Sequence, residues 1–469
     1  MLSIELLKRI FAHLDTQELL KLRLVSKAFC AVATASIVAL TLTMRFEFKV
    51  PEIRNFLSQC GGLQKLKLDL DISSDRYMFY WFQDVVRQLE PLPYVRELQV
   101  TGMAPCIWPE VTTLRVTSFR KWSVQCEHAM SLLLRWPSLT LLDLTVTLEQ
   151  GSEWIGMDLE AKQPRLKQLS LRTIGFDNLR LMQSLRDFLQ QCPYPHLREL
   201  SFVPENAPED SFSVENYPEL TALTCLPSFL AGQVKPVESI KQVHLLNVKG
   251  ESVIAKVVAV CPNVEHIRLT QGDQLFTLNR PMDGLLAHHL QSCDLTEFAD
   301  MTLDEFEYLA DTSVETLAMN CAHVPIELCR VVMDMISERF SHLRCLKVVN
   351  ASSHSREFGR MHPFLADRCV SLTINSDSED AFDIPKVLNE MEQMDVNANT
   401  AIRMMHAPKL THLTVRGTLA TKHGLQKFVK VVKGCPLLRE LKAGAQVLDV
   451  VKRAKLKVYG LHLEMLKVL

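Results

Sequence analysis

The side chains with the greatest capacity for chemistry in this sequence are its 13 cysteines and 15 histidines. Cysteine and histidine at short, regular spacing would bind zinc, and a cysteine beside a histidine could act as a nucleophile. No CxxC pair occurs, and the two close groupings, His288-His289 and Cys321-x-His323, have no third and fourth ligand at a suitable spacing. The sequence therefore predicts no metal site, and nothing selects one Cys–His pair as catalytic.

Other motifs of enzymes are missing as well. The chain has only 16 glycines, no glycine-rich phosphate loop, no G-x-S-x-G and no H-E-x-x-H. It also lacks the Cys/His spacing of a RING finger. We expect no catalytic residue and no cofactor, so function must come from binding.

The composition is that of an ordinary soluble globular protein, with 47% apolar and 23% charged residues among 469. The formal net charge of −2 argues against bulk binding of nucleic acid. Lys8 and Arg9 interrupt any secretory signal, and the uncharged run 28–44 is too short and too rich in Ala, Ser and Thr for a membrane span. Dispersed cysteines fit a reducing compartment. We expect a cytoplasmic and/or nuclear protein without membrane contact.

The first 33 residues read as three short amphipathic helices. Leu2, Leu6, Ile10 and Leu14 recur every four residues, which places them on one helical face. Asp15-Thr16-Gln17-Glu18 predicts a capping box at the start of the second helix. So small a unit rarely sustains its own core, so the surplus apolar face must meet the rest of the chain or another protein.

This stretch resembles an F-box. The matching residues are Leu2, Glu5, Leu6, Leu7, Ile10, Phe11, Leu14, Glu18-Leu19-Leu20, Val25, Ser26, Lys27 and Phe29, and Ser3 stands where the family has Pro. The resemblance implies an F-box at residues 1–34 that binds a Skp-family adaptor and through it a cullin; the alternative is a plain helical cap on a larger domain. The adaptor-binding residues that it predicts are Leu2, Leu6, Leu7, Ile10, Leu14, Leu19, Leu22, Val25 and Phe29.

From Ile37 onward one pattern recurs, apolar-x-x-apolar-x-apolar, as in Leu63-Leu66-Leu68 and Leu410-Leu413-Val415. Its mean period of roughly 27 residues is in the range of leucine-rich repeats. The alternating part predicts a short strand, and apolar stripes between copies predict helices, so the repeats must stack to bury their apolar faces. The predicted helices include 127–136, 179–191, 252–260, 327–340 and 424–433.

The repeats resemble those of F-box proteins, in which a Cys-Pro-x-Leu-x-x-Leu junction is common, as at Cys261-Pro262 and Cys435-Pro436. The resemblance implies an α/β fold: a solenoid over residues 35–469, with parallel strands on the concave face and helices on the convex face. The Asn or Cys expected just after each strand is largely missing. Irregular insertions near 71–94, 203–219 and 375–400 read as solvated linkers or partner-binding loops, and a degenerate copy around Leu461 could end the array.

Charge is distributed unevenly along the predicted solenoid. Residues 281–329 contain ten acidic residues and no Lys or Arg, whereas residues 416–469 contain twelve basic residues and three acidic ones. These stretches are either two distinct docking regions or solvated helix faces.

Together these features predict the substrate-recognition subunit of a Skp–cullin–F-box ubiquitin ligase, which is not itself an enzyme. The alternative is a protein-interaction scaffold built from leucine-rich repeats and not linked to ubiquitination. Outward strand positions would bind an unknown target protein, and an acidic or phosphorylated target would suit Arg416 and Lys442. The predicted target-binding residues are Lys65, Lys67, Glu97, Gln99, His266, Arg268, His412, Thr414, Arg416, Glu440 and Lys442.

Overall fold

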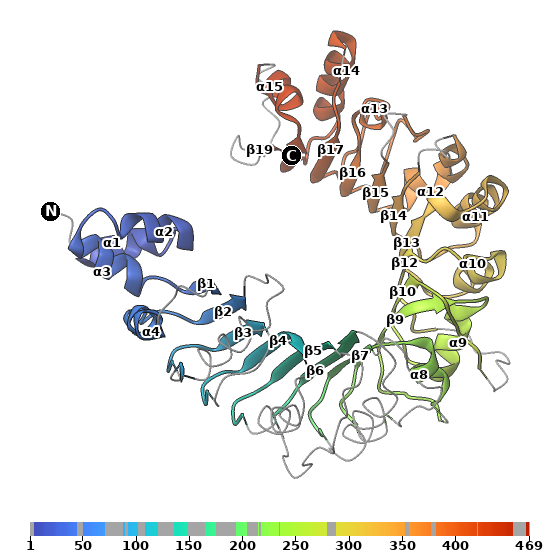
Figure 1. The fold of residues 1–469 in the computed structure, drawn as a ribbon. Coiled ribbons are helices and arrows are strands. Elements are labelled where there is room, and N and C mark those ends of the chain that lie inside the picture. The colour runs from blue at the N-terminus through green and yellow to red at the C-terminus, as the bar shows by residue number, and fades with distance from the viewer. Residues whose placement is uncertain are drawn as a thin grey trace. The chain divides into compact units, whose positions relative to one another are not determined.

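Parallel β-strands and helices make up most of the described part of the chain in the computed structural model (Figure 1). The chain divides into two compact units, Met1–Thr224 and Cys225–Leu469. The structure describes residues 4–44, 50–70, 88–89, 92–101, 108–120, 136–147, 165–174, 194–203, 214, 217–233, 235–278, 288–351, 356–376, 381–419, 421–453 and 466–468.

The first unit begins with three helices that lie beside its first strand (Figure 1). Their bounds are α1 (Ile4–Phe11), α2 (Thr16–Leu22) and α3 (Lys27–Ala35). They are followed by β1 (Ala39–Met44), α4 (Val50–Gln59), β2 (Lys65–Leu70), β3 (Glu97–Thr101), β4 (Thr113–Arg120), β5 (Leu141–Thr147), β6 (Gln168–Ile174) and β7 (Glu199–Val203). A short strand, β8 (Ala222–Cys225), spans the boundary between the units.

Each strand of the first unit pairs with the next in parallel, from β1 to β7. The register brings equivalent leucines together across the sheet, and these side chains are buried. This row runs through Leu66, Leu98, Leu114, Leu142, Leu169 and Leu200. The apolar repeat of the sequence thus becomes a continuous layer of core, as stacked repeats require.

The second unit also consists of parallel strands, and helices are described between most of them. Its strands are β9 (Gln242–Lys249), β10 (His266–Gln271), β11 (Gln274–Leu275), β12 (Ser292–Glu297), β13 (Thr316–Asn320), β14 (Cys345–Val349), β15 (Ser371–Asn375), β16 (Gln393–Asn397), β17 (His412–Arg416), β18 (Glu440–Ala443) and β19 (Leu466–Val468). Its helices are α8 (Pro227–Ala231), α9 (Val253–Val260), α10 (Leu303–Ala310), η2 (Cys321–His323), α11 (Ile326–Glu338), η4 (Glu357–Met361), α12 (His362–Asp367), α13 (Ala398–Ala401), α14 (Lys422–Lys433) and α15 (Ala445–Arg453).

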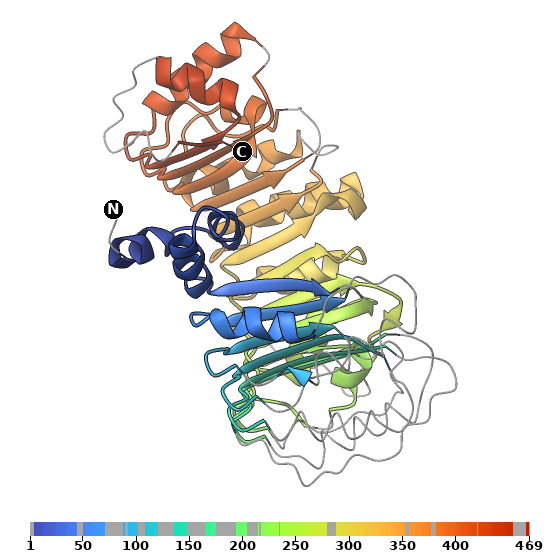
Figure 2. The same ribbon diagram turned by 60° about the vertical axis from the view of Figure 1, so that its left-hand side comes forward.

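The strands of the second unit are also parallel, and β10 pairs with β9 on one side and β12 on the other. Short β11 joins the end of β9. From β12 to β19 each strand pairs with the next along the chain. Figures 1 and 2 show α10, α11, α12 and α14 on one face of these strands, and no helix among the described residues of this unit covers the other face.

Several predicted elements form where the sequence placed them, and one stretch predicted as an insertion contains a regular strand. Helices α9, α11 and α14 form where the sequence predicted them, whereas the predicted helices 127–136 and 179–191 fall almost wholly outside the described residues. Strand β16 lies inside the stretch predicted as an insertion at 375–400. Met391, Met394 and Val396 are buried there and follow the apolar pattern, with methionine in place of leucine.

The predicted insertions near 71–94 and 203–219, and the degenerate copy around Leu461, fall largely or wholly outside the described residues. In the described part of the chain, no helix is long and apolar enough to cross a bilayer.

Candidate functional site

The three N-terminal helices pack around a small aromatic and aliphatic core. Leu7, Phe11 and Leu19 are buried, and the rings of Phe11 and Phe29 meet edge to face at 5.5 Å between centroids. Ser26 accepts the backbone N–H of Phe29 at 3.2 Å and so caps α3. These contacts hold the helices in one arrangement.

Helix α2 is fixed at its start and against the first strand. The predicted capping box is confirmed: Asp15 Oδ1 accepts the N–H of Glu18 at 2.8 Å, and Glu18 Oε2 accepts the N–H of Asp15 at 2.9 Å. The Thr16 hydroxyl donates to the carbonyl of Ala39 at 2.6 Å, which ties α2 to β1. The helices therefore have a defined position over the first strands of the unit.

The predicted adaptor-binding residues differ in their solvent exposure. Leu7 and Leu19 are buried within the helices, so they support the fold and offer no surface. Ile10 and Val25 are exposed, at 43% and 63%. Leu14, Leu22 and Phe29 are half-buried, and the side chains of Leu2 and Leu6 lie outside the described set.

Three exposed apolar residues of this stretch are absent from the predicted adaptor-binding set. Leu24 is 89% exposed, Ile4 is 59% exposed and Leu20 is 36% exposed. The helical periodicity could not identify Leu24, because α2 ends at Leu22 and Leu24 lies in the turn before α3. Exposed leucine in a short turn has no packing role, which makes it available to a partner.

A family model for the F-box domain matches residues 1–38. The chain carries an F-box domain. F-box domains in general bind Skp-family adaptors. No curated protein sequence matches the chain, so the remainder of the molecule is interpreted from its own geometry.

Outside the F-box domain, the predicted target-binding residues do occupy outward positions of their strands. In β3, β10, β17 and β18 the side chains alternate between buried and more exposed, as predicted. The predicted residues form three groups, on β2–β3, on β10 and on β17–β18.

The first group lines a groove in the first unit. The groove has a volume of about 610 Å³ and runs across β1 to β4 beside α2. Its lining includes the four predicted residues Lys65, Lys67, Glu97 and Gln99. It also includes residues that were not predicted, namely Arg115 of β4 and Thr16, Gln17 and Leu20 of α2.

Part of this lining could have been found from the sequence. Arg115 follows the same alternation as the predicted positions, because Leu114 and Val116 on either side of it are buried. The residues of α2 could not have been found, since the periodicity of a helix does not say which strands it lies beside.

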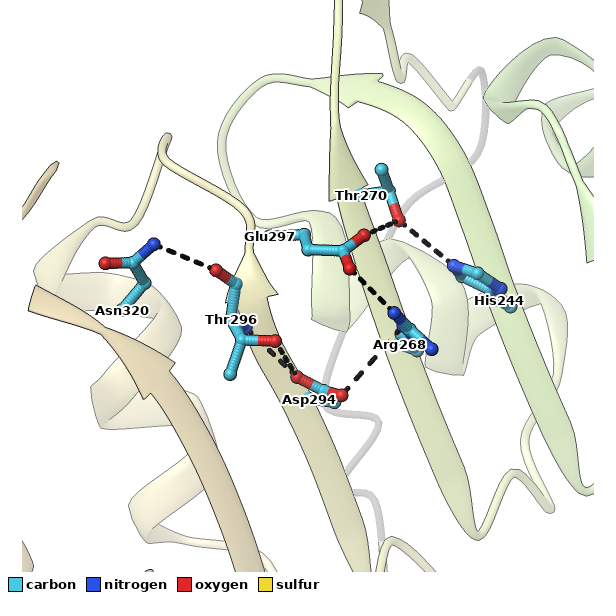
Figure 3. A network of polar contacts seen from close by, with 7 residues as sticks. All are labelled: His244, Arg268, Thr270, Asp294, Thr296, Glu297 and Asn320. Atoms are coloured by element: carbon cyan, nitrogen blue, oxygen red, sulfur yellow. Dashed lines mark hydrogen bonds and ion pairs between the residues drawn. The ribbon is translucent and has the colours of Figure 1, made fainter. Parts of the chain in front are cut away.

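The second group belongs to a closed polar network on β9, β10 and β12 (Figure 3). Arg268 Nη2 lies 2.8 Å from Glu297 Oε1, and its Nε lies 3.9 Å from Asp294 Oδ2. The Thr270 hydroxyl lies 3.1 Å from the other Glu297 oxygen and 3.0 Å from His244 Nε2. Arg268 thus already holds carboxylate partners from this chain.

The same network continues toward β13. Thr296 donates its hydroxyl to Asp294 at 2.7 Å, and Asn320 Nδ2 donates to the Thr296 carbonyl at 3.0 Å (Figure 3). Burial, together with the neighbouring Arg268, lowers the pKa of His244. His266, the other predicted residue of this group, is half-buried and lies two positions before Arg268 on the same face.

The third group is also neutralised within the chain. Arg416 holds both oxygens of Asp395, at 2.8 and 2.6 Å, and reaches Asn375 Oδ1 at 3.2 Å. Glu440 lies 3.5 Å from the Lys442 ammonium and 3.7 Å from His412 Nε2. Thr414 lies between Asp395 and Lys442 in the register. The charges predicted to attract an acidic target here are largely compensated.

Asparagines close several strands of the second unit, where the sequence analysis found the expected residue largely missing. Asn320, Asn375 and Asn397 are the last residues of β13, β15 and β16. Asn320 Oδ1 accepts the N–H of Ala322 at 2.9 Å, and Asn397 Oδ1 accepts that of Thr400 at 2.8 Å. Their role is to turn the chain away from the sheet.

One buried acid lies on the helical side of the second unit. Glu305 of α10 accepts the backbone N–H groups of Val253 at 2.5 Å and Ile254 at 3.3 Å, so it caps the start of α9. Burial raises its pKa to about 7, against the opposing effect of those two hydrogen bonds and of Lys256. Because the Glu305 side chain is buried and caps α9, its role is structural.

Among the described residues, the cysteines and histidines considered at the outset form no metal-binding group. Eight of the ten described cysteines are buried, and burial raises the pKa of thiols such as Cys225 and Cys293 well above the usual range. A protonated buried thiol is a core side chain and a poor nucleophile. Among the described residues, no group of three or more His, Cys, Asp or Glu side chains could hold a metal ion.

Proposed function

We propose that this protein is the substrate-recognition subunit of a Skp–cullin–F-box ubiquitin ligase. The F-box domain at residues 1–38 carries this proposal. The stacked strands, which we interpret as leucine-rich repeats over residues 35–469, would hold the target protein. No step of catalysis by this chain is needed, because holding a target near the ubiquitin-loaded subunit raises its effective concentration.

Four exposed apolar residues of the F-box domain are the proposed adaptor-docking face, namely Ile4, Ile10, Leu24 and Val25. Leu20, which lines the groove across β1 to β4, and Val38 are also exposed and are not part of this set. Leu7 and Leu19 hold the helices beneath it. An adaptor that covers Leu24 and Val25 would remove apolar surface from water, which supplies binding free energy at roughly 25 cal/mol per Å² before the costs of association.

Co-purification from cells tests this proposal. We expect the full-length chain to bring down a Skp-family adaptor together with a cullin. A Leu24→Asp, Val25→Asp double variant should lose both, because two charges would replace the apolar contact. Adaptor without cullin would support the alternative of a scaffold that takes no part in ubiquitination.

A matched control is available in the second unit. Met405 and Leu437 are exposed to a similar degree, at 63% and 52%, and lie outside the F-box domain. A Met405→Asp, Leu437→Asp variant should retain the adaptor fully. If both double variants retained it, the assigned docking face would be wrong; if the wild-type chain brought down no adaptor, the proposed function would fail.

A further inference from the structure

The groove of the first unit is built from two parts of the chain that the sequence treats as separate domains. Its lining residues come from β1 to β4 and from α2 of the F-box domain. Thr16, Gln17 and Leu20 lie on one side of α2, at positions one and four residues apart, where they can face a common neighbour. The hydrogen bond from Thr16 to Ala39 ties α2 to β1.

These three residues are distinct from the proposed adaptor-docking set. None of Ile4, Ile10, Leu24 and Val25 belongs to the described lining of the groove. The F-box domain therefore has two different exposed surfaces, one apolar and one that faces the strands. A bound adaptor and an occupant of the groove would contact different side chains of the domain.

Of the cations that line the groove, Arg115 is the one without an ion pair to any described residue. Lys65 pairs with Glu97 at 2.7 Å, and Lys67 pairs with Asp69 at 3.1 Å. Arg115 is exposed and makes no ion pair or hydrogen bond with any of the described residues, although Asp143 is its neighbour in the register. A guanidinium in this position can bind both oxygens of a carboxylate in one plane.

The dimensions fit a short extended segment. Thr41, Lys67, Gln99 and Arg115 occupy one row across four adjacent strands. Strands lie about 4.8 Å apart, so the row spans about 14 Å, or roughly four extended residues. The groove volume is in the usual range of binding sites, about 300–1,000 Å³. Leu20, which is 36% exposed, supplies an apolar contact at one side.

We infer that this groove binds an extended acidic segment of the target protein, with a carboxylate on Arg115 and an apolar side chain against Leu20. The inference rests on the proposed function, since it identifies where the target is held. It also makes α2 part of target recognition, so the target is held directly against the domain that docks the adaptor. Lys65 and Lys67 keep their ion pairs with Glu97 and Asp69, so Arg115 is the cation that meets the target's carboxylate.

A peptide-library experiment on the full-length chain with its adaptor tests this inference. The probes are immobilised peptides of about eight residues with one fixed Glu and one fixed Leu, because the row spans roughly four extended residues. Matched libraries carry Gln or phosphoserine in place of Glu. We expect the Glu library to bind more tightly than the Gln library, and Arg115→Glu to weaken it by at least about tenfold.

Three further variants make the result specific. Arg115→Lys should weaken the Glu library less than Arg115→Glu does, because it keeps the charge without the planar pair of donors. Leu20→Ala should weaken it by loss of the apolar contact. Arg172→Glu is the matched control, since Arg172 is exposed on the same face of β6 but does not line the groove.

Each outcome has a defined meaning. Equal binding of the Glu and Gln libraries, or equal loss with Arg115→Glu and Arg172→Glu, would overturn the groove assignment. Tighter binding of phosphoserine than of Glu would overturn the choice of a carboxylate. Adaptor capture by all these variants should equal that of the wild-type chain, so failure of the proposed function would appear separately, as absence of the adaptor.

Discussion

Two regions of parallel sheet differ in whether an exposed arginine is ion-paired with described residues of the chain. On β9, β10 and β12, Arg268 lies among Asp294 and Glu297 and is held by both. On β1 to β4, Arg115 makes no ion pair with any described residue and lines a groove closed on one side by the F-box domain. Exposure alone does not separate the two arginines, since both are exposed on outward positions.

The difference shows how a binding surface can be recognised in a repetitive fold. A charged side chain that already has partners must lose them before it binds a target, and this cost offsets most of the gain. A charged side chain without partners loses only water. We therefore place the target at the groove and regard the network of Figure 3 as stabilising the sheet.

The largest change in stability is expected from Glu305, whose buried carboxyl lies on the helices behind β9 to β12. Its pKa is raised from 4.5 to about 7. The protonated form is therefore favoured by folding, so the stabilisation is complete below the unfolded pKa and is lost as the pH rises through about 7. Between about pH 5 and about pH 8.5 the wild-type chain should lose on the order of 2 kcal/mol of unfolding free energy.

Glu305→Gln cannot ionise, and it keeps one acceptor oxygen for the N–H of Val253 or Ile254 while a donor NH2 group replaces the other oxygen. Urea denaturation of this variant should show a much flatter pH dependence than that of the wild-type chain. Glu307→Gln, a change at an exposed acid of the same helix, should leave the wild-type pH dependence in place. If Glu305→Gln retained the full pH dependence, the buried carboxyl would not be its source.

A smaller effect compares the two arginines directly. Arg268→Met should lower the free energy of unfolding by about 0.5–1 kcal/mol, since it removes the ion pair with Glu297 and leaves two acids side by side. Arg115→Met should change stability by less than about 0.5 kcal/mol, because no described partner is lost. Chemical denaturation of both variants measures the difference. Equal destabilisation would remove the distinction on which the choice of the groove rests.

The sequence predicted much of the fold because apolar spacing translates directly into buried rows. Most of the strands and three of the five predicted helices named above follow from it, and so does the capping box at Asp15 and Glu18. Strand β16 was not predicted because Met391, before the strand, and Met394, within it, stand at leucine positions of the pattern. The strand-ending asparagines were missed because they are not spaced regularly along the chain.

The candidate site was predicted only in part, for physical reasons. Alternation along a strand identifies the outward face, so Lys65, Lys67, Glu97 and Gln99 were found. It does not show which charges are paired across strands, since Asp395 and Arg416 are far apart in sequence and bidentate in space. Nor does it show that α2 lies beside β1 to β4. Helical periodicity likewise selected Leu7 and Leu19, which face inward.

Hydrogen exchange of the full-length chain, with and without a purified Skp-family adaptor, tests whether the adaptor-docking residues and the groove are separate surfaces. We expect the adaptor to slow amide exchange in α1 and in the turn that contains Leu24 and Val25. We expect no change in β2, β3 and β4, where the groove is left free for a target. Slowed exchange in those strands, with none at Leu24 and Val25, would contradict the separation of the two surfaces.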